Sequence, residues 1–473
     1  MKPAWILLYL WSIAFINYFD RGALPALLKN IQITLNIGYT KAGTLASSFL
    51  IGYCLSTPIF AYLANKISPL KVICYGLMGF CIGAFLMGIV DTDSFAILSL
   101  FRILIGLGEA GFLCIAPSFI DDNAPVKWRS TWLAIFMISL PVGYAAGYLI
   151  GGIFTENFDF CPKTGTECWR AVFIAESIAI VPFIIFGFKI SSKIKLKKNR
   201  NEEVDINSER KYKSFLSKVK YLFTNPVYVL SVIGYTNYNY LLGGFSIWGP
   251  QFISDNYNLS FAKADIYFGI TSAISGILGT LIGGLLLDRM KGDLNRSSSI
   301  SKALYLSSLS MLSAMPFILF SIYLYNLGIL LFMLVVGLTL AFLLQGPINC
   351  IFLWVVPSII RPLSVSFAII ISHLLGDVLS PIIMGSLLTY TKDGTCDTIC
   401  QSSVNYPFPG KCDNVGTCIA PYPNGNFRLV LLITSIWGGI SAIFWIIAYL
   451  LYKKKLKRKF RESLLPNDSI NIL

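Results

Sequence analysis

The chain has 473 residues, of which 55% are hydrophobic and only 13% are charged. Because a soluble domain carries about 25% charged residues, this composition excludes a soluble enzyme, a secreted disulfide scaffold and a disordered protein. The net charge of +14 is concentrated in connectors between apolar runs, which indicates membrane surfaces and not nucleic acid as the partner. The apolar residues are enough for about twelve membrane-crossing helices of about 20 residues each.

Twelve apolar runs separated by short polar connectors predict an all-α membrane protein with twelve transmembrane helices. The predicted spans are residues 4–28, 41–64, 71–90, 97–119, 129–153, 170–188, 226–253, 262–287, 302–325, 328–356, 363–391 and 427–451.

A basic, polar stretch at 191–225 divides these spans into two sets of six. We therefore expect an N-terminal half at 1–190, a cytoplasmic linker at 191–225, a C-terminal half at 226–452 and a cytoplasmic tail at 453–473. A short charged turn follows the second span of each half, with Asn65 and Lys66 in the first half and Asp288 and Arg289 in the second. This recurrence of a charged turn indicates a parallel repeat of two six-helix halves, with the two turns as gating elements.

The distribution of Lys and Arg predicts the orientation of the chain. If both termini are cytoplasmic, the cytoplasmic segments hold 28 of these residues and the opposite side holds eight. Cytoplasmic loops carry the excess of positive charge in membrane proteins, so we expect the termini and the linker in the cytosol.

The eleven cysteines divide by location. Five lie within spans and are interpreted as small apolar fillers: Cys54, Cys74, Cys81, Cys114 and Cys350. Six lie in two loops on the lumenal or outer side, one of them the Cys-rich loop 392–426: Cys161, Cys168, Cys396, Cys400, Cys412 and Cys418. An even number on the oxidising side predicts disulfides, with Cys161 joined to Cys168 and the connectivity of the other four open.

Ionisable residues within the predicted spans are the candidate functional residues, because they are costly at bilayer depth and mark substrate or ion paths. Asp20 and Arg21 lie in the first span, and Arg102 and Glu109 lie on one face of the fourth, about 10 Å apart along the axis. Arg102 and Glu109 are too far apart to pair directly, so each needs a partner on another helix. Two interpretations stay open: a network that moves a proton, and a permanently paired structural contact.

His373 and Asp377 form a secondary polar site, since residues at i and i+4 are neighbours on a helix. His373 is the only histidine in the chain, which excludes a histidine-based metal site. The alternative role for His373 is a hydrogen-bonded packing residue. We expect no metal and no cofactor.

Four stretches of the chain resemble the Spinster branch of the major facilitator superfamily. They are residues 17–21 (NYFDR), 102–117 (RILIGLGEAGFLCIAP), 268–279 (FGITSAISGILG) and 373–381 (HLLGDVLSP). The resemblance implies a proton-linked, alternating-access exporter of single-chain lipids such as lysophospholipids or sphingoid phosphates. It also implies that Asp20, Arg21, Arg102 and Glu109 form the charge network of the N-terminal half.

The chain departs from the family pattern in two places. The G-x-x-x-D-R turn of the family appears in the first half as Ala61, Asn65 and Lys66, so its carboxylate is missing there, whereas Asp288-Arg289 retains it in the second half. The lumenal loop 392–426 is longer than the family pattern predicts.

The predicted function is a proton-coupled transporter of a single-chain lipid, with the lipid tail near Phe245 and Trp248. The alternative is a proton-coupled symporter of a small polar metabolite such as a sugar, an amino acid or an organic anion, since fold alone does not determine the substrate. A lipid-modifying enzyme is disfavoured, because no nucleophile elbow or metal motif is present. We expect a monomer in the lysosomal or vacuolar membrane, with the plasma membrane as the alternative; Leu464-Leu465 is a weak sorting signal.

Overall fold

A computed structural model describes most of the chain. The described residues are 4–64, 67–90, 94–113, 115–123, 129–156, 169–191, 214–291, 296–357, 360–391, 411–412, 418–419 and 426–464.

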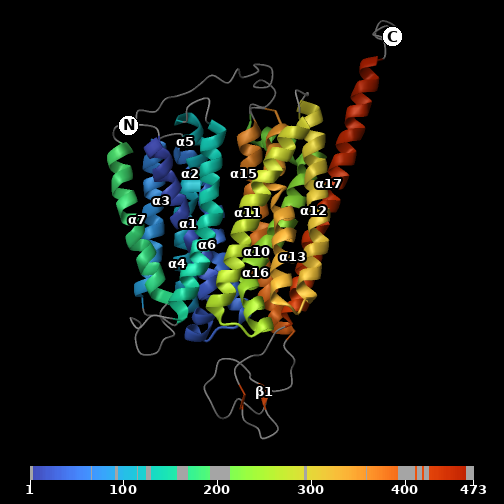
Figure 1. Cartoon of the computed structure of the whole chain (residues 1–473). Helices are drawn as coiled ribbons and strands as arrows, with labels where there is room; N and C mark the ends of the chain where they lie inside the picture. The colour runs from blue at the N-terminus through green and yellow to red at the C-terminus, as the bar shows by residue number, and fades with distance from the viewer. Residues whose placement is uncertain are drawn as a thin grey trace.

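Helices dominate the described residues, and together they form a long bundle (Figure 1). In chain order the elements are α1 (Ala4–Leu35), α2 (Tyr39–Ala64), α3 (Pro69–Ile89), α4 (Phe95–Leu113), α5 (Ala116–Asn123), α6 (Arg129–Glu156), α7 (Trp169–Ser191), α9 (Phe215–Thr224), α10 (Pro226–Tyr257), α11 (Phe261–Lys291), α12 (Arg296–Tyr323), α13 (Leu327–Phe342), α14 (Gln345–Trp354), α15 (Arg361–Ser372), the π-helical turn η3 (His373–Asp377), α16 (Leu379–Tyr390), β1 (Lys411–Cys412), β2 (Cys418–Ile419) and α17 (Phe427–Leu464).

The all-α membrane fold predicted from the apolar runs is confirmed. Ten stretches among the described residues are long and apolar enough to cross a membrane. Helices α1 and α10 are not among the ten, but each has 32 residues and lies in the same bundle (Figure 1). The structure is thus compatible with twelve spans.

The structure differs from the predicted elements in several places, among them the spans 328–356, which is divided into α13 and α14, and 363–391, which is divided into α15, η3 and α16. The predicted span 97–119 is divided into α4 and α5, because Pro117 has no backbone N–H to continue a helix but is well suited to the first helical turn. The linker contains a helix, α9, that its polar composition concealed. Helix α17 extends beyond residue 451 to Leu464 through Lys, Arg, Glu and Leu, which are strong helix formers.

The contacts between helices repeat in the two halves, as a duplicated bundle requires. In the N-terminal half α2 packs on α4, and α3 packs on α4 and α7; in the C-terminal half α11 packs on α13, and α12 packs on α13 and α17. The two most extensive contacts between the halves also match, α2 with α16 and α6 with α11. Each contact thus has its counterpart in the other half.

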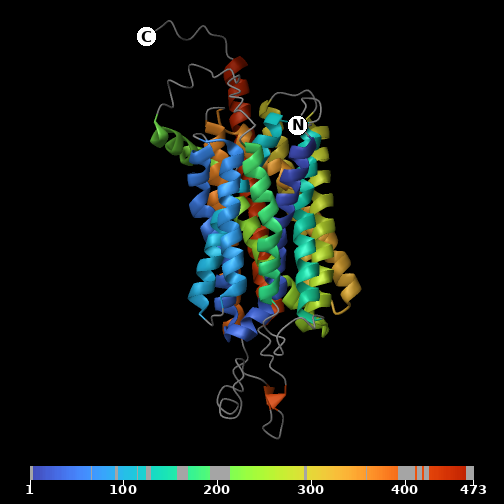
Figure 2. The ribbon, with the colours of Figure 1, turned by 90° about the vertical axis from the view of Figure 1, so that its left-hand side faces the viewer.

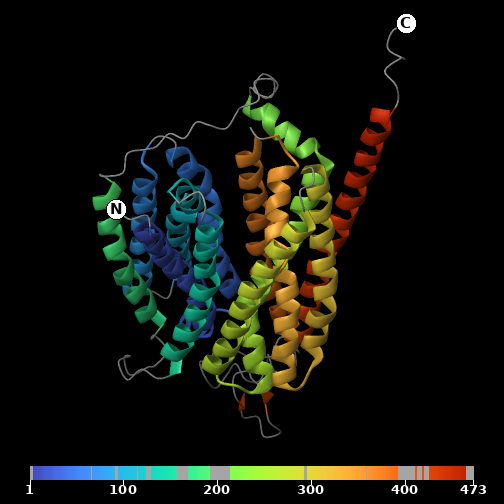
Figure 3. The same cartoon turned by 45° about the horizontal axis from the view of Figure 1, so that its top comes forward.

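The contacts between the halves gather at the end of the bundle where β1 lies. The hydroxyl groups of Thr40 and Thr389 are 3.2 Å apart, and the Tyr148 hydroxyl donates to the Ser246 carbonyl. Toward the opposite end, where α9 lies, the ribbons of the two halves diverge (Figure 3).

The described segments outside the predicted spans lie at the two ends of the bundle. Helix α9 and the C-terminal part of α17 lie at one end of the bundle, and β1 lies at the other (Figures 1 and 2). Strands β1 and β2 pair antiparallel, with Cys412 opposite Cys418 in the backbone register. The other predicted disulfide residues, Cys161, Cys168, Cys396 and Cys400, lie outside the described residues.

Glycine allows α2 and α4 to approach closely, which is how helices associate in lipid. A Cβ atom at Gly106 would lie 1.8 Å from the Phe49 carbonyl oxygen, so no other residue fits without separating the two helices. A Cβ atom at Gly284 in α11 would meet no atom within 4 Å.

We predict opposite effects of the same substitution at these two glycines. Gly106→Ala should destabilise the protein by about 1–3 kcal/mol, the usual cost of overpacking. Gly284→Ala should be neutral or stabilising by up to about 1 kcal/mol, because Ala is the better helix former. Thermal unfolding in detergent micelles measures both, and equal melting temperatures for the two variants would contradict the close contact.

The orientation yields a second prediction. A tag within residues 191–213 and a tag at the C-terminus should both react with an impermeant reagent once only the plasma membrane is permeabilised. A tag within residues 392–410 should react from the lumenal or outer side. Reactivity of the linker and the C-terminal tag from opposite sides would contradict two six-helix halves.

Candidate functional site

Two ion pairs cross between α1 and α4 inside the N-terminal half. Arg102 Nη1 lies 2.7 Å from Asp20 Oδ1, and Arg21 Nη2 lies 2.9 Å from Glu109 Oε1. Adjacent residues on a helix point about 100° apart, so Asp20 and Arg21 point in different directions. Their partners Arg102 and Glu109 are two turns apart along α4. The structure thus brings together all four charged residues that the sequence placed in these two spans.

The two pairs differ in their access to solvent. The exposed fractions of the side chains are 0% for Asp20, 1% for Arg102, 0% for Glu109 and 12% for Arg21. Breaking a buried pair leaves an uncompensated charge, so the Asp20–Arg102 pair is strongly constrained. Arg21 is the most exposed member of the network.

Aromatic rings surround both guanidinium groups. The Arg21 guanidinium lies 4.8 Å from the ring centre of Tyr18, 4.9 Å from Phe49 and 5.5 Å from Tyr53. The Arg102 guanidinium lies 5.6 Å from the same Phe49 ring. Each cation therefore gains cation–π stabilisation where few water molecules reach it.

Glu176 on α7 belongs to this network, although the sequence analysis missed it. Its side chain is 3% exposed, and its carboxyl group interacts with the carboxyl group of Asp20 and the guanidinium group of Arg102. The signal that could have found it is the one that found the others, an acidic residue within a predicted span (170–188).

The secondary polar site lies on η3 in the C-terminal half. His373 Nδ1 and Asp377 Oδ2 are in hydrogen-bond contact, and the Val378 N–H donates to the His373 carbonyl across a five-residue π turn. Single π turns inside helices are frequent at functional sites. Here the turn keeps the i, i+4 contact that the sequence predicted.

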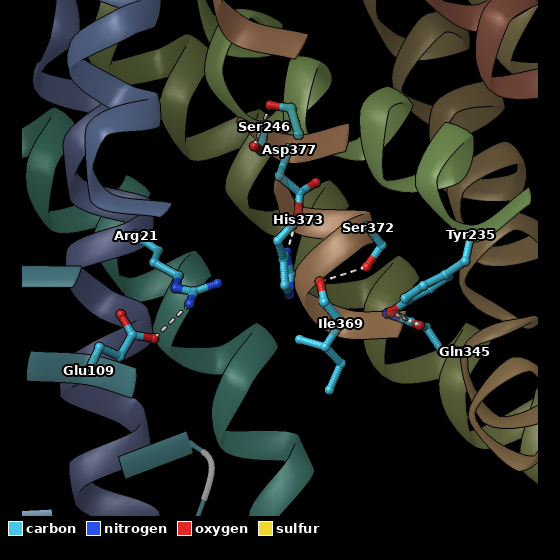
Figure 4. Close-up of polar contacts among 10 residues, drawn as sticks. Arg21, Glu109, Tyr235, Ser246, Gln345, Ile369, Ser372, His373 and Asp377 are labelled. Carbon is cyan, nitrogen blue, oxygen red and sulfur yellow. Dashed lines mark hydrogen bonds and ion pairs between the residues drawn. The ribbon is translucent and has the colours of Figure 1, made fainter. Parts of the chain in front are cut away.

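Tyr53 connects the sites of the two halves. Its ring lies edge-on to the His373 ring at 5.7 Å, and it also contacts the Arg21 guanidinium. Figure 4 shows Arg21 and Glu109 on one side and His373 with Asp377 on the other. An ion pair and a His–Asp pair therefore face each other where the halves meet.

The predicted tail-binding residues are buried in this conformation. Trp248 Nε1 donates to the Pro381 carbonyl at 3.2 Å, and its ring lies edge-on to Tyr39 of the other half at 5.6 Å. Phe245 is buried beside Phe268 at a small apolar void. Both side chains lie toward the end where the halves touch.

The structure describes one of the two predicted gating turns. Asn65 and Lys66 lie outside the described residues, whereas Asp288 and Arg289 are exposed near the end of α11. Lys302 of α12 donates to the Met290 carbonyl and so caps this helix end. Among the described residues, no cluster of three or more His, Cys, Asp or Glu side chains could hold a metal ion.

Comparison with known proteins agrees with this architecture. The Major Facilitator Superfamily profile matches residues 10–390. The "Probable sphingolipid transporter spinster homolog 2" of Arabidopsis thaliana is 31% identical over 86% of this chain and 86% of its own length. "Protein spinster homolog 1" of Homo sapiens is 25% identical over 81% of this chain and 72% of its own length.

A solved structure shows the same fold. The crystal structure of a bacterial homolog to the human lysosomal transporter Spinster, in an inward-facing and unoccupied conformation, superposes with a TM-score of 0.77 over 96% of this chain and 98% of the other, at 19% identity. The chain is thus a transporter and not an enzyme, and it belongs to the Spinster family of the major facilitator superfamily.

Proposed function

We propose that this protein is a proton-coupled, alternating-access transporter of single-chain lipids with a charged headgroup, such as a lysophospholipid or a sphingoid phosphate. The names of its plant relatives, "probable sphingolipid transporter", support a lipid substrate. The observation that carries the proposal is Arg21, a partly exposed guanidinium opposite the His373–Asp377 pair of the other half.

Arg21 and Asp377 together provide the chemistry for a zwitterionic headgroup. A guanidinium binds a phosphate through two parallel hydrogen bonds. Asp377, whose carboxylate contacts the imidazole of His373 on its own helix, offers an acceptor to an ammonium group. A headgroup between them would contact both halves at once.

Substrate binding and proton binding are linked through Glu109. A phosphate that binds Arg21 competes with the Glu109 carboxylate for the same guanidinium. Glu109 is fully buried, so loss of its cation favours its neutral, protonated form. Because such coupling is reciprocal, the lipid and the proton bind together, which is the requirement for symport.

The lipid tail needs an apolar path beside this site. We expect the tail to lie against Phe245 and Trp248 when the halves separate at the end where they now touch. The divergence of the ribbons at the opposite end and the likeness to an inward-facing bacterial structure support an inward-facing conformation here.

We place the protein in the lysosomal or vacuolar membrane as a monomer, with the termini in the cytosol. An acidic lumen would drive symport outward into the cytosol. The Cys-rich loop would then face an oxidising lumen, and the backbone register of β1 and β2 supports a Cys412–Cys418 disulfide among the three open pairings.

The transport function is tested in proteoliposomes with an imposed proton gradient. Wild-type protein should move a lysophospholipid or a sphingoid phosphate, and Asp20→Asn or Glu109→Gln should abolish the proton-driven flux while substrate binding is retained. Glu462→Gln, in the last turn of α17 beyond the predicted spans, is the matched control and should keep wild-type flux.

Two results would contradict the proposal. Wild-type flux with unchanged pH dependence in both acid variants would show that the proton is carried elsewhere. Flux of a sugar, an amino acid or an organic anion without flux of either lipid would favour the metabolite symporter.

The charge network also predicts unequal effects on folding. Arg102→Ala leaves the buried carboxyl groups of Asp20 and Glu176 without a cation and should cost about 3–5 kcal/mol. Asp20→Asn should cost less, because Arg102 retains Glu176 as a partner. Yields of folded protein and melting temperatures in detergent measure the difference, and equal losses in the two variants would contradict the network.

A further inference from the structure

The buried network of the N-terminal half has more acids than bases. The described side chains that meet there carry three carboxyl groups, on Asp20, Glu109 and Glu176, and two guanidinium groups, on Arg21 and Arg102. Each guanidinium pairs with one carboxyl group at less than 3 Å. One carboxyl group is therefore in excess.

Glu176 is the carboxyl group in excess. Both of its oxygens are buried, and neither receives a hydrogen bond from any of the described residues. The Oδ2 atom of Asp20 also lacks a donor, while its Oδ1 atom receives the hydrogen bond from Arg102. The Glu176 carboxyl group contacts that of Asp20, so two orphaned acceptor groups face each other.

Two ionised carboxylates in contact would repel each other strongly in an apolar interior. One proton removes the conflict, because a protonated carboxyl group is a donor and its neighbour is an acceptor. The resulting O–H···O hydrogen bond satisfies an oxygen on each residue. Asp20 keeps its charge against Arg102, which assigns the proton to Glu176.

Among the described residues, the other titratable groups around Glu176 are engaged elsewhere. On α3, the Cys81 thiol donates to the Ser177 carbonyl. On α4, Arg102 is bonded to Asp20, and Glu109 is paired with Arg21 of α1. On α7 itself, Arg170 donates to the Val90 carbonyl at the outer end of the helix.

We propose that Asp20 and Glu176 form a proton-binding site that holds one shared proton in this conformation, with Glu176 as the donor. The use of this proton in transport rests on the proposed function. The site itself does not, because it is required by the charges and the burial of the two side chains. Movement of Arg102 away from Asp20 would allow the pair to bind a second proton, and its approach to Glu176 would release the first.

The site is tested through unfolding, with no transport measurement involved. The folded protein holds a proton that the unfolded chain releases near neutral pH, so the free energy of unfolding decreases as the pH rises. We expect wild-type protein in detergent to release about one proton more on unfolding than Glu176→Gln. The melting temperature of the variant should accordingly depend less on pH.

Three further variants make the test decisive. Asp20→Asn should also lose the extra proton, because Glu176 can then ionise against Arg102. Glu176→Asp should retain it. Ser177→Ala, which removes a neighbouring buried hydroxyl that donates to the Ile174 carbonyl of its own helix, should behave as wild type.

The proposal is overturned if Glu176→Gln and Asp20→Asn both release as many protons as wild type. A failed flux assay with the expected proton release would contradict proton coupling alone, leaving a structural proton at this site. A successful flux assay with unchanged proton release would contradict the site alone.

Discussion

The Asp20–Arg102 ion pair is the constraint on which the rest of the N-terminal half depends. Neither side chain is exposed, and a buried charge is tolerated only when it is paired and hydrogen-bonded. The pair therefore determines how α1 and α4 are rotated about their axes. Once these rotations are set, Arg21 must point to Glu109 and toward the other half.

The same constraint explains why aromatic rings and glycines accompany the charges. Phe49 lies against both guanidinium groups, and its backbone carbonyl lies against Gly106 of α4. The close backbone contact of α2 and α4 brings the ring to the cations. In this part of the bundle, packing and electrostatics are therefore set by the same contact.

Much of the helical architecture could be predicted from the sequence, because a lipid bilayer requires long apolar runs. The acids and arginines of α1 and α4 were evident for the same reason. Which acid pairs with which arginine depends on the rotation of each helix, and periodicity within one helix does not determine this. Helix α9 was missed because it is short and lies in a stretch dominated by basic residues, and the π turn at η3 was missed because it retains an i, i+4 contact.

Tyr53 makes the charge network sensitive to the position of the other half. Its ring contacts the Arg21 guanidinium of its own half and the His373 imidazole of the other half. When the halves move apart at this level, water takes the place of the imidazole and the local dielectric constant around Arg21 rises. The strength of the Arg21–Glu109 attraction therefore depends on the conformation of the protein. A rigid-body motion of one half changes the electrostatic energy of an ion pair that lies within the other half.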